Sequence, residues 1–424
     1  MQRASEAGIK AGVTRTLEQR ERAVVLLVAA VQFVNILDFV MVMPMGPDFA
    51  RALGIPASQL GLIGGSYTAA AALSGLAGSF FLDRFDRRPA LGIAMLGLVL
   101  GTALGAAATG LPSLMAARLL AGLFGGPATS LSFSIVADVV PAQRRGKAMG
   151  VVMGAFSIAS VLGVPAGLEL ARQVGWRAPF LAVAGLGVVI ALLAVLLLPP
   201  LRGHLVARHE AVSLAHLFSQ RNVLLSWAMT FAVMSAGFLV IPNISAYVQF
   251  NLHYPRARIG LLYLYGGAVS FVAMQFAGRL VDRFGSFRVG TAGTLLLVFA
   301  IWAGFILAPP LLPVPGIFIA FMLAMAFRNV AYNTLTSRVP ESFERARFMS
   351  IQSAVQHAAA AAGAFLSSRL LAELPDGALR GMDRVGALSI AITLALPFLL
   401  FAVEGAVRRR ERPVLGPGMA AEAP

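Results

Sequence analysis

The stretch Asp83-Arg84-Phe85 follows a long apolar run that contains Gly78, and it returns about 200 residues later as Asp282-Arg283-Phe284 after a run that contains Gly278. The pairs Val140-Pro141 and Val339-Pro340, each followed by basic residues, repeat in the same way. Two halves with the same topology, related by an axis along the membrane normal, are typical of transporters whose binding site lies between the halves.

The composition excludes a soluble protein. Of 424 residues, 58% are hydrophobic and only 12% are charged, against about 25% charged in soluble proteins. The apolar runs are long and continuous, whereas the strands of a membrane β-barrel alternate apolar and polar residues. Twelve spans of about 20 residues need about 240 apolar positions, which this chain has.

We therefore predict an all-α membrane protein with 12 transmembrane helices in two six-helix halves. The predicted parts are an N-terminal tail (1–22), an N-terminal half (23–199), a central loop (200–222), a C-terminal half (223–405) and a C-terminal tail (406–424). The predicted spans are 23–46, 57–81, 89–109, 113–137, 148–170, 178–199, 223–248, 259–279, 289–308, 316–337, 349–370 and 385–405.

Basic residues predict the orientation. The tails and the loops on their side of the predicted bundle carry 24 Lys and Arg residues, whereas the loops on the other side carry eight. Because basic loops stay in the cytoplasm, we expect both termini, the central loop and the N- and C-terminal tails to be cytoplasmic. The net charge of +15 then reflects orientation and lipid contact rather than nucleic-acid binding.

The sequence contains none of the motifs for cofactor binding or enzyme catalysis that we considered. There are no cysteines, so thiolate metal sites are excluded. The two lysines, Lys10 and Lys147, are not followed by Ser or Thr, so there is no P-loop. We expect no cofactor, no metal and no enzymatic activity.

These segments resemble the major facilitator superfamily over residues 20–408. The loop Asp83-Arg84-Phe85 is similar to the first cytoplasmic motif of that family, with Ser79 and Asp86 in places where glycine is usual. Leu114 and Arg118 in span 4 look like the motif associated with proton transfer. Gly163, Pro165 and Gly167 in span 5, preceded by Gly154, look like the antiporter motif. The resemblance implies a transporter of the drug and sugar efflux branch.

Asp38 is the one acidic residue deep inside a predicted span. A bare carboxylate there costs at least about 2.5 kcal/mol, so we expect it to face a cavity, a partner or a proton. Gln32, Asn35 and Asp38 share one helical stripe that continues to Met41. The alternative is a polar stripe that only holds helices together.

Arg118 lies at a similar depth in span 4, and the resemblance implies that spans 1 and 4 are neighbours. We expect Asp38 and Arg118 to form the proton-coupling pair, because a nearby guanidinium changes the proton affinity of a carboxylate. The alternative is a fixed structural pair.

Arg328 is too deep in span 10 to reach the membrane surface easily. We expect it to line the substrate cavity and to bind an anionic or strongly polar group; the alternative is an arginine held by backbone carbonyls or glutamine side chains. Further candidates for the cavity are Gln32, Asn35, Met41, Asn243, Tyr247, Asn329, Tyr332, Asn333 and His357. For His357 a hydrogen bond between helices, and for the other polar residues a packing role, remain alternatives.

The repeated loops suggest a conformational latch formed by Asp83, Arg84, Arg87, Arg88, Asp282 and Arg283. A carboxylate at a span end can cap a helix and pair with loop arginines. The alternative is a fixed topology signal. The glycines of spans 4 and 5 suit helices that approach closely and bend, or ordinary tight packing.

We therefore predict a secondary active transporter in a bacterial-type cytoplasmic (inner) membrane, and more specifically a proton-coupled exporter of small molecules (a drug, sugar or metabolite). We expect it to work by alternating access and as a monomer. The alternatives are an importer or an uncoupled facilitator and, remotely, a membrane receptor or enzyme.

Overall fold

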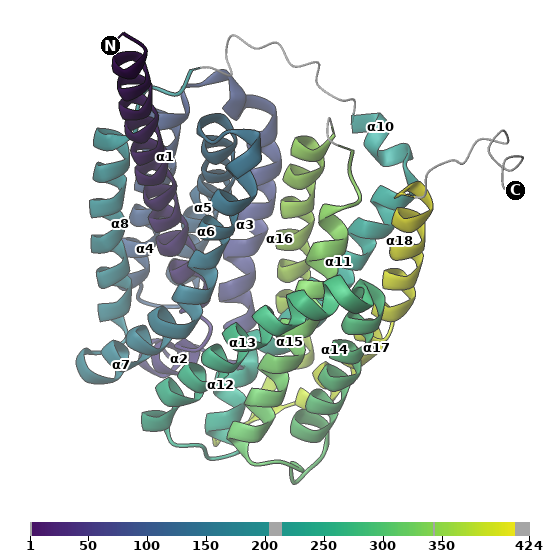
Figure 1. Ribbon diagram of the computed structural model, residues 1–424. Helices are drawn as coiled ribbons and strands as arrows, with labels where there is room; N and C mark the ends of the chain where they lie inside the picture. The colour runs from purple at the N-terminus through teal and green to yellow at the C-terminus, as the bar shows by residue number, and fades with distance from the viewer. Residues whose placement is uncertain (1, 203–213, 342–343, 412–424) are drawn as a thin grey trace, which may run out of the picture.

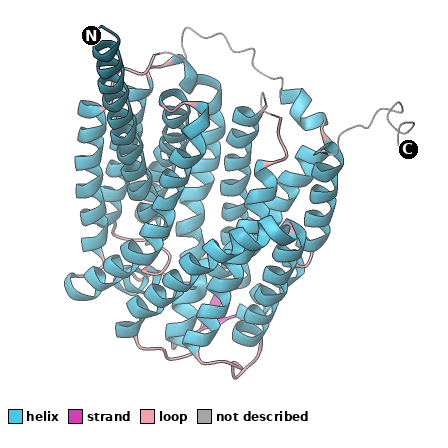
Figure 2. Ribbon diagram, in the orientation of Figure 1, coloured by secondary structure: helices cyan, strands magenta, loops and turns pink. Residues whose placement is uncertain are grey.

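A computed structural model describes residues 2–202, 214–341 and 344–411, and almost all of these residues are helical. The helices run roughly alongside one another, and the chain enters and leaves at the same end of the bundle, the upper end in Figure 1. We call this the termini end. A two-stranded ribbon, Ala372–Glu373 (β1) paired with Leu379–Arg380 (β2), lies toward the opposite end (Figure 2).

The first half of the chain forms one group of helices. Its elements are α1 (Gln2–Val40), α2 (Gly46–Leu53), η1 (Ala57–Gln59), α3 (Leu60–Phe81), η2 (Leu82–Arg84), α4 (Arg87–Ala106), α5 (Leu111–Val139), α6 (Ala142–Ile158), η3 (Ala159–Gly163), α7 (Val164–Val174) and α8 (Arg177–Leu197). Helix α5 packs against both α3 and α4, and α1 packs on α5, α6 and α8.

The second half repeats this arrangement. Its elements are α10 (Leu214–Ser219), α11 (Arg221–Val240), η4 (Ile241–Asn243), α12 (Ile244–Ala246), η5 (Tyr247–Asn251), α13 (Arg256–Phe284), α14 (Ser286–Ile301), η6 (Trp302–Ile306), α15 (Val314–Ser337), α16 (Arg345–Leu370), α17 (Met382–Thr393) and α18 (Leu396–Glu411). Helix α15 packs against both α13 and α14, as α5 does against α3 and α4.

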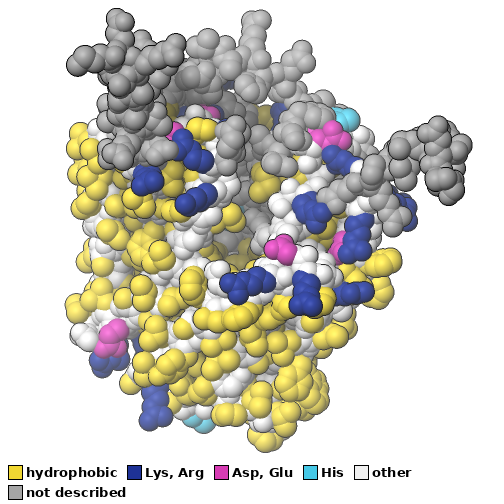
Figure 3. All heavy atoms as spheres, in the orientation of Figure 1, with side chains coloured by type: hydrophobic (Ala, Val, Ile, Leu, Met, Phe, Trp, Pro, Cys, Tyr) yellow, Lys and Arg dark blue, Asp and Glu magenta, His cyan; other side chains and the backbone are white. Residues whose placement is uncertain are grey.

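Eleven segments of the described chain are long and apolar enough to cross a membrane. The predicted span 349–370 corresponds to α16, which is 26 residues long but is more polar, with Gln352, Gln356 and His357, and is not among the eleven. The prediction of a helical membrane protein with many apolar spans is confirmed. The twelfth crossing, at α16, stays a prediction. Apolar side chains cover much of the visible outer face (Figure 3), as a membrane protein requires.

Several predicted boundaries are wrong. The apolar part of α1 covers Glu21–Val40, so the predicted start of span 1 at residue 23 is close, but the helix ends at Val40 rather than at residue 46. A turn over residues 41–45 contains Pro44, and proline disfavours helical geometry in the residue before it. The predicted final span is divided between α17 and α18. Residues 203–213 of the central loop and 412–424 of the C-terminal tail lie outside the described residues.

The two halves meet along α3 and α16. At the end opposite the termini, Ser245 donates a hydrogen bond to the carbonyl of Pro44 (2.7 Å), and Glu373 accepts one from the backbone of Ala57. Nearer the middle, Phe39 of α1 stacks on Phe238 of α11 with ring centroids 6.0 Å apart. The structure is therefore closed at the end opposite the termini.

Candidate functional site

Asp38 and Arg118 form a buried ion pair between α1 and α5. Arg118 Nη1 donates to Asp38 Oδ1 (3.0 Å) and Nη2 pairs with Oδ2. The side chains of Asp38 and Arg118 are 0% and 1% exposed. Thr102 of α4 also donates to Asp38 Oδ1 (2.7 Å). Two-pronged pairing between charged groups is both strong and geometrically specific, so both oxygens of Asp38 are held in this conformation.

Tyr67 of α3 completes the surroundings of this pair. The Arg118 guanidinium lies 4.9 Å from the centre of the Tyr67 ring, within the range of a cation–π interaction. The Tyr67 hydroxyl donates to Asn35 Oδ1 (2.8 Å). Asn35 Nδ2 in turn donates to Thr129 Oγ1 (2.7 Å) and to the carbonyl of Gly125 (3.1 Å). These contacts tie α1, α3 and α5 together.

Glycines allow α5 to approach this network closely. A side chain at Gly122 would collide with the Tyr67 carbonyl, and one at Gly125 would collide with the Tyr67 hydroxyl and lie 2.8 Å from Asn35 Oδ1. Small residues are the usual means by which membrane helices approach each other. The sequence singled out Asp38, Arg118 and Asn35 but missed Tyr67 and Thr102, because single Tyr and Thr residues in apolar helices carry no spacing signal.

Arg328 of α15 lies in the other half and is 1% exposed. Its Nη2 donates to the carbonyl of Val233 on α11 (3.2 Å) and lies 2.9 Å from Met325 Sδ. Its Nε and Nη1 are buried and have no partner among the described residues. The structure therefore does not pair Arg328 with Asp38.

The other residues predicted for the cavity each have contacts of their own in the structure. Asn243 donates to Ser367 (3.1 Å), Gln356 donates to the Tyr332 hydroxyl (3.1 Å), and Tyr247 packs on Phe305. His357 Nδ1 lies 2.8 Å from the carbonyl of Ser353 on its own helix. Gln32 and Met41 are buried, Asn329 is partly buried and Asn333 is exposed. Buried oxygens of Gln32, Asn243 and Asn329 have no partner in the described structure.

The repeated loops hold helix ends in a way that the sequence did not predict. Asp86 caps α4: it accepts hydrogen bonds from the backbone of Arg88 (3.0 Å) and Leu201 (3.1 Å) and pairs with Arg202 (2.9 Å). Burial opposes ionisation of Asp86, but these hydrogen bonds and the Arg202 charge outweigh it and lower its pKa.

In the second half, glycine stands at the matching position, Gly285, and Glu404 of α18 accepts the hydrogen bond from the backbone of Phe287 instead. A Cβ at Gly285 would lie 2.6 Å from Glu404 Oε1, and its φ is +87°. Such a backbone favours glycine. The same cap is thus supplied from two different places in the sequence.

Residues predicted as a latch take separate positions. Arg87 pairs with Asp138 of α5, and Arg88 donates to the carbonyl of Leu198 (3.2 Å). Arg84 and Asp282 are exposed, and Arg283 lies over the ring of Phe284. The side chain of Asp83 lies outside the described residues.

The antiporter-type motif shapes α6 and α7. Residues Ala159–Gly163 form one wide π-helical turn directly before Pro165, as expected because proline cannot donate a backbone hydrogen bond. A Cβ at Gly163 would lie 2.7 Å from Leu37, the residue before Asp38. Gly167 lies near Met41, whereas Gly154 faces open space.

At the end opposite the termini, an ion pair joins the two halves. Arg256 of α13 donates from Nε and Nη2 to the two oxygens of Asp48 on α2 (2.6 Å each) and to the carbonyl of Leu168 on α7 (3.1 Å). Both side chains are only partly exposed, at 21% and 18%. This pairing could not be predicted from the sequence, since the partners are far apart in the chain and lie in predicted loops.

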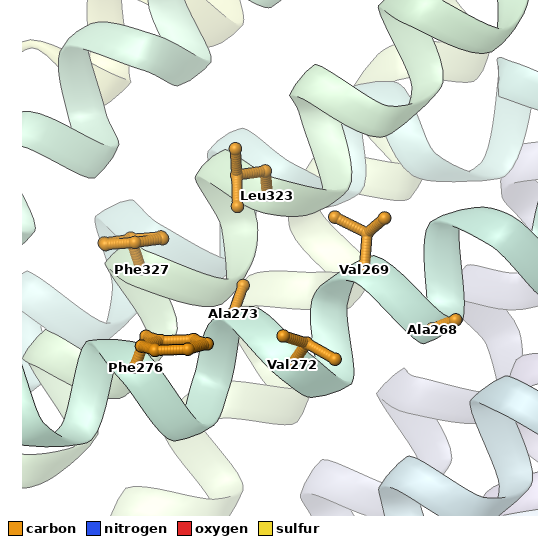
Figure 4. A pocket seen from close by; sticks show the side chains of 7 residues that line it. All are labelled: Ala268, Val269, Val272, Ala273, Phe276, Leu323 and Phe327. Carbon is orange, nitrogen blue, oxygen red and sulfur yellow. The ribbon is translucent and has the colours of Figure 1, made fainter.

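A groove of about 400 Å³ lies between α13 and α15 (Figure 4). Seven apolar side chains line it: Ala268, Val269, Val272, Ala273, Phe276, Leu323 and Phe327. It contains none of the charged or hydrogen-bonded groups described above. Such a groove suits hydrocarbon, and we place the chemistry at the buried arginines instead.

Comparison with known proteins decides the family. The family model described as Major Facilitator Superfamily matches residues 28–364. The chain belongs to the major facilitator superfamily. It is a multi-pass membrane transporter rather than an enzyme, and it resembles the drug-efflux branch.

Among its relatives is a chloramphenicol resistance protein of Streptomyces lividans, 29% identical over 64% of this chain and 70% of the relative. The inner membrane transport protein YdhP of Escherichia coli (strain K12) is 29% identical over 61% of this chain and 66% of the relative. A crystal structure of a D-xylose–proton symporter superposes with a TM-score of 0.68 at 18% identity, covering 88% of this chain and 96% of that one. That likeness shows the shared fold.

Proposed function

We propose that this protein is a proton-coupled exporter of small molecules in a bacterial inner membrane, working as a monomer by alternating access. The observation that carries the proposal is the buried pair of Asp38 and Arg118. An ionisable group so deep in a membrane protein is expensive to keep, and Asp38 is the only acid at this depth in the N-terminal half.

The pair offers a simple coupling mechanism. A carboxylate held by a guanidinium binds protons less readily than one without it. When α5 and α1 move apart, Asp38 loses the donors of Arg118 and takes up a proton. When they return, Arg118 displaces that proton. The motion of the halves is thereby linked to proton transfer at Asp38.

The geometry also offers a gate. With both termini in the cytoplasm, as the distribution of basic residues predicts, the closed end is the outer end and the structure faces inward. Asp48 and Arg256 then hold the outer end shut. Opening toward the outside requires this pair to break, and the latch loops at the termini end to close.

Transport by everted membrane vesicles tests the function. Chloramphenicol is the first probe, because a relative is named for resistance to it, and a panel of antibiotics, dyes and sugars follows. A proton-coupled exporter accumulates its substrate in vesicles that are acidic inside and stops when the gradient is collapsed. An uncoupled facilitator equilibrates its substrate whatever the gradient, and an importer empties the vesicles; either result contradicts the proposal.

A further inference from the structure

Arg328 is a buried cation that pairs with no carboxylate among the described residues. Its contacts are one carbonyl, that of Val233, and the sulfur of Met325. Nε and Nη1, which carry most of the guanidinium N–H donors, have no partner among the described residues. Buried charges are normally paired and hydrogen-bonded, because removing them from water is otherwise costly. An arginine that only held helices together would be better satisfied than this one.

The neighbouring helices cannot supply the missing partner. Within their bounds α11, α14, α15 and α16 contain no Asp or Glu. Asp282 of α13 is exposed near the end of its helix, and Glu404 of α18 is paired with Arg408. In the other half, Asp38 is held by Arg118. None of these carboxylates pairs with Arg328 in the described structure.

The repeat shows which position lacks an acid. Phe238 is 199 residues after Phe39, and the two rings stack across the interface of the halves. By the same count, Gly237 is the counterpart of Asp38. A Cβ built on Gly237 lies 3.4 Å from Arg328 Nη2. The second half thus has an arginine beside the counterpart of the aspartate, with a glycine in the aspartate's place.

We propose that the anionic group of the transported molecule, a carboxylate on an apolar body, binds Arg328 and takes the place that Asp38 fills in the other half. This inference rests on the proposed transport function and names its substrate class. A guanidinium matches the two oxygens of a carboxylate. The side chains near Gly237, Met325 and Ile241, are apolar, and flexible methionines adapt to varied apolar groups. A monoanion with an apolar body fits this environment better than a dianion.

Substitutions at Gly237 test this inference directly, because a Cβ at this position would meet its neighbours only at ordinary contact distance. Gly237→Asp gives Arg328 an internal carboxylate, whereas Gly237→Ala adds bulk without charge. Arg328→Gln removes the cation. The purified proteins are mixed with naphthoate, with the neutral naphthamide and with the cationic naphthylmethylamine, and binding is followed by thermal unfolding and by equilibrium titration.

We expect naphthoate alone of the three to stabilise the wild type and Gly237→Ala. Gly237→Asp and Arg328→Gln should bind it at least about tenfold more weakly, the size of one charge-assisted interaction. The inference is overturned if naphthoate binds no better than naphthamide, or if Gly237→Asp and Arg328→Gln bind it as the wild type does. Gradient-driven transport of other probes would then leave the proposed function standing. Arg328-dependent binding without any gradient-driven transport would instead contradict the proposed function alone.

Discussion

Phe39 and Phe238 occupy the same position in the two halves of the chain and stack on each other with their planes at 21°. Phe39 also stacks on Tyr67 (5.1 Å between ring centroids), and the Arg118 guanidinium lies over the Tyr67 ring. The contact between the halves is therefore continuous with the surroundings of Asp38. A rearrangement at this interface reaches the ion pair through two aromatic rings.

Removing both partners of the buried pair should destabilise the protein by much less than the sum of the two single removals. Asp38→Asn or Arg118→Gln leaves a buried charge uncompensated, at a cost of about 3–5 kcal/mol. The double variant leaves none, so its loss should be well below the sum of the two. Unfolding of the purified proteins in detergent measures this. Losses that simply add would show that the two side chains do not interact.

The glycines of α5 should tolerate substitution only where there is space. Gly125→Ala should lower the unfolding temperature by several degrees, because the added methyl group collides with Tyr67 and Asn35. Gly185→Ala on α8, which faces open space, is the matched control and should be neutral or stabilising by up to about 1 kcal/mol. Equal effects of the two changes would contradict the close packing described.

Breaking the ion pair between the halves should open the end opposite the termini. Asp48→Asn removes a partly exposed pair worth about 1 kcal/mol, which shifts the equilibrium between closed and open forms about fivefold. The chain has no cysteines, so cysteines introduced at the exposed Ala52 and Ala257 carry spin labels without background. The distance distribution should gain a longer component. An unchanged distribution would argue against a gate at this pair.

The cap formed by Asp86 should make stability depend on pH. The pKa of Asp86 is lowered in the folded protein, so the unfolded chain binds protons more readily and stability rises with pH. The contribution is present above the unfolded pKa of about 3.9 and is lost as pH falls through the folded value. Asp86→Asn should therefore lower the unfolding temperature at neutral pH, and should lower it by less at a pH below the unfolded pKa. The same difference at both pH values would refute the role of the Asp86 charge.

Much of the fold was predictable because it follows from composition and repetition. The lengths of the apolar runs indicated the helices, and the recurrence of Asp83-Arg84-Phe85 indicated two equivalent halves. Span ends were predicted less well, since α1 ends at Val40 and not at residue 46. Hydropathy reports only where a helix is apolar, not where its hydrogen bonding stops.

The site was predictable only where a residue is costly in its setting. Asp38, Arg118 and Arg328 stand out because charges are rare in membrane helices. Tyr67 and Thr102 are chemically unremarkable in such helices and are recognised only from their contacts with the pair. Asp48 and Arg256 lie 208 residues apart, and only the packing of the two halves brings them together.

The central claim is that Asp38 carries the coupled proton. Proton release on substrate binding tests it most directly, measured with a pH-sensitive dye in weakly buffered solutions of purified wild type and Asp38→Asn, with the substrate identified in vesicles. Binding to Asp38→Asn, confirmed by titration, keeps the comparison valid. Substrate binding that favours the paired state displaces the proton from Asp38, so we expect the wild type to release protons on binding and Asp38→Asn to release none. Equal release from both proteins would contradict the account.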